Sequence, residues 1–317
     1  MVTEANVPNI VRLDVFRQGG HTYTEPMKST LQNPHSGLQN TAVRRVVLVT
    51  GGTKGIGRGI ALGFLSAGDI VVVCGRQAPE TLPQVDNNTA EFIACDVKDL
   101  AAVQSLIATV TQQHGRLDVL INNAGGSPSA DAATASPRFH ESVIRLNLLA
   151  PFNLAQVANA QMQQQEQGGV IIFIGSISAL RPSPGTAAYG AAKAAVLSLV
   201  GSLAVEWAPK VRVVAVSPGL VRTEQSALHY GDEAGIAAVA AGIPMGRMAE
   251  PDDIAQACLY ASSNAASYLS GSNVLLHGGG EKPAFLGAVS NSAATNKSPS
   301  PAAVTPASGS NASGSPA

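Results

Sequence analysis

The sequence predicts an α/β fold, a single doubly wound domain in which helices cover both faces of a parallel sheet. Between residues 43 and 284, short apolar runs alternate with segments of helical length, the pattern of parallel strands joined by crossover helices. Several runs end in glycine, asparagine, serine or aspartate, at the edge where such sheets build their sites. Hydrophobic residues make up 45% of the chain and charged residues only 13%, so we expect a large buried core and subunit contacts.

The individual elements follow from the spacing of apolar residues. Strands are predicted where turn residues bound a short apolar run, at residues 46–50, 70–74, 92–95, 117–121, 170–174, 212–216 and 273–276. Helices are predicted where apolar residues recur at helical spacing or alanine is frequent, at about residues 55–67, 100–114, 138–162, 186–208, 234–241 and 252–262. The segment 224–248 follows the last strand that forms the site, and we expect it to act as a mobile lid.

Composition and charge exclude several functions. The formal net charge is −1, so no basic field indicates nucleic acid or an anionic membrane as a partner. The three cysteines form no Cys-x-x-Cys pair, which favours buried thiols in a reducing compartment over a disulfide or a metal site. We find no apolar run of about 20 residues and no signal-peptide core. A cytoplasmic protein without a membrane partner is therefore expected.

Both ends of the chain differ from the predicted domain. Residues 1–42 are mixed and polar, and we interpret them as an extension that is at best partly ordered. The sequence does not decide between Met1 and Met27 as the true start. Residues 285–317 consist mainly of serine, alanine, proline, asparagine, threonine and glycine. Such a segment buries too little apolar surface to offset its ordering entropy, so we predict a disordered tail.

A strand, a loop and a helix bring three chemically useful side chains together. Ser176 follows the strand 170–174, and Tyr189 and Lys193 stand four residues apart on the next helix, on one face. A free tyrosine has a pKa of about 10, and a nearby ammonium is expected to lower it toward neutral pH. The serine hydroxyl can donate to a substrate oxygen that gains charge. Tyr-x-x-x-Lys alone is a weak motif, and a surface tyrosine is the alternative.

Three glycines mark a nucleotide site. Gly51, Gly55 and Gly57 follow the first strand and open a helix, where free amides attract a pyrophosphate and missing side chains allow its close approach. A plain strand-to-helix turn is the alternative, but it rarely needs three glycines at these positions. The pattern predicts a dinucleotide in a Rossmann-type domain. Asp96 either accepts from the adenine amino group or caps its loop, and the amides of residues 122–125 can brace the glycine loop.

Taken together, these motifs resemble the short-chain dehydrogenase/reductase family, in the subgroup of 3-oxoacyl-carrier-protein reductases. The resemblance spans about residues 44–280 and rests on Thr50-Gly51-(x3)-Gly55-Ile56-Gly57, Asn122-Asn123-Ala124-Gly125, Asn147, Ser176, Tyr189-(x3)-Lys193 and Pro218-Gly219-(x3)-Thr223. It implies four catalytic residues, Asn147, Ser176, Tyr189 and Lys193, with Asn147 holding a water that links the lysine to solvent. It also implies a set of cofactor-binding residues, namely Gly51, Thr53, Lys54, Gly55, Ile56, Gly57, Arg76, Asp96, Val97, Asn123, Ala124, Gly125, Tyr189, Lys193, Pro218, Gly219, Val221 and Thr223. Ser217 and His277 depart from the residues that the family often has there.

The end of the second strand predicts the choice of cofactor. An NAD enzyme normally places an acid there, which accepts from the adenosine ribose hydroxyls and repels a 2′-phosphate. Here Gly75 has no side chain, and Arg76 follows with a guanidinium that can pair with a phosphate. Lys54 adds a second cation, as in family members that use NADP. We predict NADP(H) as the preferred cofactor and NAD(H) as less favoured; ordinary solvated cations are the alternative.

These observations predict an oxidoreductase that interconverts a ketone, 3-oxoacyl or other, and a secondary alcohol, with Tyr189 as acid and base. A catalytically silent, nucleotide-sensing member of the same fold is the alternative, although all four catalytic positions are filled. The partner is expected to be a small carbonyl or alcohol substrate whose identity the sequence does not disclose. By resemblance, we expect a homotetramer, or else a homodimer.

Overall fold

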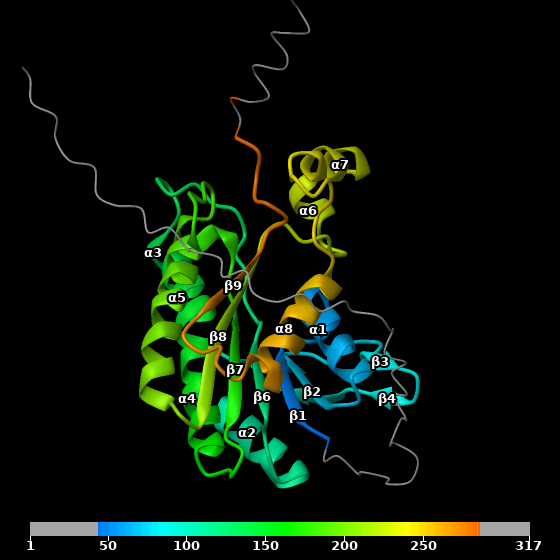
Figure 1. Ribbon diagram of the computed structural model, residues 1–317. Helices are drawn as coiled ribbons and strands as arrows, with labels where there is room; N and C mark the ends of the chain where they lie inside the picture. Colours follow the sequence, from blue (N-terminus) through cyan, green and yellow to red (C-terminus); the bar gives the residue numbers. More distant parts are fainter. Residues whose placement is uncertain (1–43, 284, 286–317) are drawn as a thin grey trace, which may run out of the picture. The chain divides into compact units, whose positions relative to one another are not determined.

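Seven parallel strands form the central sheet of the computed structural model, which describes residues 44–283 and 285 (Figure 1). In chain order they are β1 (Val46–Thr50), β2 (Ile70–Gly75), β5 (Glu91–Ala94), β6 (Val119–Asn122), β7 (Gly169–Ile174), β8 (Val211–Pro218) and β9 (Asn273–Leu276). Their order across the sheet is β5-β2-β1-β6-β7-β8-β9, and each neighbouring pair is parallel. The strand order reverses at β1 and β6, where open α/β sheets bind their ligands.

Two apolar layers hold helices on opposite faces of this sheet. On one face α2 (Leu100–His114), α4 (Ala150–Met162) and α5 (Ala187–Trp207) contribute buried residues such as Leu106, Leu154 and Val196. On the other face α1 (Gly55–Ser66) and α8 (Pro251–Ser262) contribute Phe64 and Ile254. The predicted doubly wound α/β fold is confirmed. Most predicted strands agree with the observed ones to within two residues at each end.

Two local features differ from the prediction. The helix expected over residues 138–162 is instead α3 (Pro137–Ile144), the π-helical turn η1 (Arg145–Leu149) and α4. The short strands β3 (Gln84–Val85) and β4 (Asn88–Thr89) form a hairpin that two-residue strands are too short to reveal in sequence. The extension 1–42, the choice of Met27 and most of the tail 285–317 lie outside the described residues.

By length and composition alone, helix α5 could cross a membrane, with a mean hydropathy of 1.5. The prediction that the chain has no apolar run of about 20 residues is wrong for this helix. The core helix of a globular protein passes the same test. One face of α5 packs Val196 and Val200 into the apolar layer against the sheet, and 39% of its apolar window is buried.

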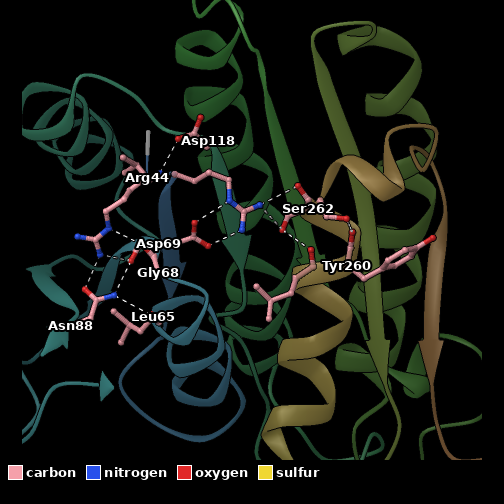
Figure 2. A network of polar contacts seen from close by, with 12 residues as sticks. Arg44, Leu65, Gly68, Asp69, Asn88, Asp118, Tyr260 and Ser262 are labelled. Carbon is pink, nitrogen blue, oxygen red and sulfur yellow. Dashed lines mark hydrogen bonds and ion pairs between the residues drawn. The ribbon is translucent and has the colours of Figure 1, made fainter. Parts of the chain in front are cut away.

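The amino edge of the sheet is held by a polar network (Figure 2). Arg45 donates to both carboxylate oxygens of Asp69, at 3.0 and 2.7 Å, and also to the carbonyl and hydroxyl of Ser262, at 3.3 Å. The N–H of Val46 donates to Asp118 Oδ2 at 2.8 Å. These contacts tie the start of β1 to the α1–β2 turn, to β6 and to the end of α8. The opposite, carboxyl edge is left for the site.

Candidate active site

Ser176, Tyr189 and Lys193 form one cluster at the carboxyl end of β7. Lys193 Nζ lies 5.6 Å from the centre of the Tyr189 ring and donates to the carbonyl of Ile174 at 2.7 Å. The hydroxyl of Ser176 lies close enough to the Tyr189 phenol to lower its pKa. Ser176 precedes the 3₁₀ turn η2 (Ile177–Ala179), where its Oγ accepts from the N–H of Ser178 at 3.1 Å. The structure therefore brings together the three side chains that the sequence singled out.

Burial changes the acid–base properties of this cluster. It raises the pKa of Tyr189 above its ordinary value, while the hydrogen bond with Ser176 opposes that rise. The expectation of a lowered Tyr189 pKa is wrong for this structure, because desolvation dominates and Lys193 donates to Ile174 instead. Burial lowers the pKa of Lys193 to about 8. At pH 7 the phenol is a proton donor and most of the lysine is charged.

Asn147 lies directly beside this cluster, in the π-helical turn η1. Its side chain is fully buried. Oδ1 accepts from the N–H of Gly126 at 2.8 Å, and Nδ2 donates to the carbonyls of Gly126 and Val143 at 2.9 Å. A Cβ on Gly125 would lie 2.7 Å from Asn147 Oδ1 and 3.5 Å from Lys193 Nζ. The asparagine and the lysine thus approach the same glycine, and π turns often occur at functional sites.

The glycine loop after β1 forms a cradle that other residues would fill. Gly51 and Gly55 have φ values of +62° and +53°, in the region that favours glycine. A Cβ on Gly57 would lie 2.3 Å from the Gly51 carbonyl oxygen and 2.4 Å from Asn123 Nδ2. Asn123 Nδ2 donates to the carbonyl of Thr50 at 2.8 Å and so braces the loop. Lys54 does not cap the start of α1 with its side chain, and the N–H groups of a helix start suit a pyrophosphate.

The two predicted cations lie near this cradle, Lys54 directly before α1 and Arg76 directly after β2. Within residues 44–283, the exposed side chains of Lys54 and Arg76 make no ion pair or hydrogen bond. Gly75 lies next to the glycine loop, since a Cβ there would be 3.9 Å from Thr53 Oγ1. Asp96 accepts from the N–H of Lys98 at 3.0 Å. Asp96 therefore caps its own loop, which was the alternative to a contact with adenine. Its second carboxylate oxygen lies 3.7 Å from Lys98 Nζ.

The segment after β8 crosses the glycine loop and includes a residue that sequence reasoning missed. Glu224 Oε1 accepts from the N–H of Gly55 at 2.9 Å. A Cβ on Gly55 would also contact Thr223 Cγ2, at 3.8 Å. A carboxylate thus lies at the helix start that is expected to bind phosphate. The sequence feature that could have pointed to Glu224 is its position directly after Thr223, a predicted cofactor-binding residue.

The other cofactor-binding residues predicted on this side fix the backbone of the same segment. Gly219 donates to the carbonyl of Leu276 at 2.7 Å, and a Cβ on it would lie 2.9 Å from His277. Val221 forms a bridge with Ala249. Of the remaining predicted residues, Ile56 and Val97 pack against the two apolar layers. The N–H of Ala124 donates to Thr50 Oγ1 at 2.9 Å. Pro218 is the last residue of β8. Side-chain roles toward a cofactor stay predictions.

Two short helices lie above the carboxyl edge, in the segment for which the sequence predicts a mobile lid (Figure 1). They are α6 (Ala227–Tyr230) and α7 (Glu233–Ala241), with Ile236, Ile243 and Met248 buried in a small cluster of their own. Arg181, in the loop between Ser176 and Tyr189, pairs with Glu281 at 2.7 Å. Sequence reasoning assigned no role to this pair.

Comparison with known proteins gives matches over most of the described chain. A family model described as enoyl-(acyl carrier protein) reductase matches residues 51–281. A 3alpha-hydroxysteroid dehydrogenase from Mediterraneibacter gnavus is 36% identical over 236 residues, 72% of this chain and 93% of that protein. A 2-dehydro-3-deoxy-D-gluconate 5-dehydrogenase from Pseudoalteromonas atlantica is 35% identical over 243 residues, 74% of this chain and 95% of that protein.

Solved structures agree with this result. A ligand-free aldohexose dehydrogenase from Thermoplasma acidophilum has a TM-score of 0.69 and 28% identity, and the match covers 74% of this chain and 93% of that one. The protein ElxO with NADP bound has a TM-score of 0.69 and 30% identity, with 74% and 98% covered. The relatives act on chemically different compounds, so the comparisons do not single out one substrate.

Proposed function

Because this chain belongs to the short-chain dehydrogenase/reductase family of oxidoreductases, we propose that it interconverts a ketone and a secondary alcohol with NADP(H). The observation that carries the proposal is the cluster of Ser176, Tyr189 and Lys193, in which a serine hydroxyl acts on a phenol that lies beside a buried ammonium. A proton donor, a hydrogen-bond donor and a fixed charge are what carbonyl reduction requires.

Each side chain has a distinct task in this proposal. Bound NADPH supplies the hydride. Tyr189 donates its proton to the substrate oxygen, and its raised pKa keeps that proton available at neutral pH. The hydroxyl of Ser176 donates to the same oxygen as negative charge develops. Lys193 provides positive charge beside the phenol, and because burial lowers its pKa to about 8, it gives up a proton more readily than a solvated amine does.

The preference for NADP(H) follows from charge at the end of β2. The exposed guanidinium of Arg76 is not committed to a carboxylate among residues 44–283, and Gly75 offers no acid that repels a 2′-phosphate. Arg76 can pair with such a phosphate through two N–H groups, with Lys54 as a second cation. Thr53, Asn123 and the glycine cradle would hold the remainder of the nucleotide.

Replacement of Tyr189 by phenylalanine tests the mechanism. The ring keeps its packing but loses the exchangeable proton, so kcat should fall by orders of magnitude while NADPH binding, followed by fluorescence, persists. Tyr260→Phe is the matched control, because Tyr260 is an exposed tyrosine of α8 and its loss should leave kcat unchanged. A substrate for the assay comes from NADPH oxidation with 3-oxoacyl thioesters, cyclic ketones, steroids and sugars. Near-normal turnover by Tyr189→Phe contradicts the proposed mechanism.

We also propose that the enzyme is a homotetramer. Large apolar side chains remain exposed on two faces, with Tyr268 at 103%, Tyr260 at 54% and Leu275 at 37% around α8 and β9, and Val205 at 81% on α5. A second copy of the chain would cover these side chains and remove their apolar area from water. Light scattering at micromolar concentration should give the mass of four chains, and a monomer mass contradicts the assembly.

A further inference from the structure

Two of the cysteines lie on neighbouring strands. Cys74 belongs to β2, and Cys95 follows the last residue of β5, the edge strand of the sheet. The register pairs Cys74 with Ile93, and the N–H of Cys95 donates to the carbonyl of Gly75 at 2.9 Å. Because residues two apart along a strand share a face, both thiols lie on the same face of the sheet. There both belong to the same buried apolar layer.

The two thiols are chemically unequal. The hydrogen bond with Cys74 lowers the pKa of Cys95, against the opposing effects of burial and of the carboxylates of Asp96 and Asp99. The same bond, together with burial, raises the pKa of Cys74. Cys258 lies in α8, and burial alone raises its pKa. Cys95 is therefore the thiol with the most thiolate character, and the thiolate is the form that reacts with oxidants.

Access also favours Cys95. Cys74 is fully buried and Cys95 is 5% exposed, at the end of a four-residue edge strand whose own ends, Glu91 and Ala94, are exposed. Short edge strands open locally at a lower free energy than the whole domain. A small oxidant can therefore reach Cys95 without global unfolding, and Cys74 lies on the same face of the neighbouring strand, two residues away in register.

We propose that Cys74 and Cys95 form a reversible redox pair that is oxidised by hydrogen peroxide or an organic hydroperoxide and that weakens cofactor binding. The Cys95 thiolate attacks the peroxide, forming an S–O bond as the O–O bond breaks and water or an alcohol leaves. The Cys74 thiol then attacks that sulfur, forming the S–S bond as water leaves. Two thiols lose two electrons and two protons, and one hydroperoxide is reduced to water and an alcohol, or to two waters.

The expected loss of cofactor affinity follows from the residues that come directly after each cysteine. Gly75 and Arg76 come directly after Cys74, and Asp96 directly after Cys95. Because the register contact is diagonal, and disulfides usually join Cα atoms about 4.4–6.8 Å apart, the bond should draw the two strand ends together. Arg76 and Asp96 then move relative to the glycine cradle. This loss of affinity rests on the proposed function, whereas formation of the bond does not.

The full-length protein, treated with hydrogen peroxide and then freed of it, tests both parts. Intact mass should fall by two hydrogen atoms, peptide mapping should identify the Cys74–Cys95 link, and dithiothreitol should reverse it. NADPH binding, measured by fluorescence, should weaken by about tenfold on oxidation, the effect of losing one charged contact. Cys258→Ala removes a buried thiol elsewhere and should behave as the unmodified protein. Cys95→Ala and Cys74→Ala should show neither the link nor the loss.

Several outcomes overturn the inference. Peroxide that adds oxygen to the cysteines without forming the link contradicts the pairing. A link that leaves NADPH affinity unchanged, or an equal loss of affinity in Cys95→Ala, contradicts the coupling to the cofactor. If the reduced protein binds no NADPH, the proposed function has failed, and the mass measurement still decides whether the pair exists. If one alanine variant does not fold, Cys95→Ser provides the same comparison.

Discussion

Lys193 is a buried ammonium, and the free energy that it costs the fold can be measured by replacing it with methionine, a side chain of similar length. Burial lowers its pKa from 10.5 to about 8. Since one pH unit corresponds to about 1.4 kcal/mol, the charged form destabilises the folded state by about 3 kcal/mol at pH 7. Lys193→Met also loses the donor to the Ile174 carbonyl, which costs about 1 kcal/mol. We therefore expect a net gain of about 2 kcal/mol in the free energy of unfolding.

The gain should depend on pH in a defined direction. Between the folded pKa of about 8 and the ordinary value of 10.5, the unfolded chain binds more protons at this lysine than the folded protein. The free energy of unfolding of the unmodified protein therefore rises with pH through that window, relative to the variant. The advantage of Lys193→Met is present in full below about pH 8 and disappears as the pH approaches 10.5.

Urea denaturation of the cofactor-free protein, at one protein concentration and several pH values, measures this difference. Lys193→Arg is the control, because its guanidinium stays charged throughout. The difference in the free energy of unfolding between Lys193→Arg and Lys193→Met should therefore not change with pH. Turnover should be lost in Lys193→Met, so stability and activity move in opposite directions. A methionine variant that is less stable at pH 7, or a difference that does not change with pH, refutes the reasoning.

Further predictions concern the cofactor site. Arg76→Ala should lower the preference for NADPH over NADH, measured as the ratio of the two kcat/KM values, by at least about tenfold. The double variant Gly75→Asp with Arg76→Ala should favour NADH. An unchanged kcat/KM ratio in Arg76→Ala would show that Arg76 does not contact the phosphate. Gly57→Ala should abolish NADPH binding in a fluorescence titration, because its Cβ would lie 2.3 Å from the Gly51 oxygen. Glu224→Gln should tighten NADPH binding a few-fold at low salt by removing a like charge; weaker binding would show that the carboxylate is needed there.

Much of the fold was predictable because apolar runs and turn residues are local signals. The sequence alone predicts that Ser176, Tyr189 and Lys193 lie together, because a buried strand and the helix after it determine which edge of the sheet each side chain reaches. Asn147 was identified only by resemblance. Its partner Gly126 is 21 residues away, and the spacing of apolar residues does not distinguish a π turn from the α-helix on either side.

What the sequence could not provide depends on burial and on contacts between distant segments. Glu224 meets Gly55 across 169 residues of chain, so no local pattern links them. The Tyr189 pKa was predicted from its neighbouring charge, but desolvation by the assembled fold outweighs that charge. The contact between Cys74 and Cys95 likewise needs the pairing of β2 with β5.

The charged network at the amino edge should contribute to stability and leave the site unaffected. Asp69 is 5% exposed and receives two hydrogen bonds from Arg45. Loss of one partner of a buried ion pair costs about 3–5 kcal/mol, and because the Arg45 side chain is 32% exposed we expect about 2 kcal/mol for Arg45→Met. The urea midpoint should fall accordingly, while NADPH affinity, set at the opposite edge of the sheet, should not change. A weakened affinity in a fully folded variant would instead mean that β1 transmits a change at its start to the glycine loop at its end.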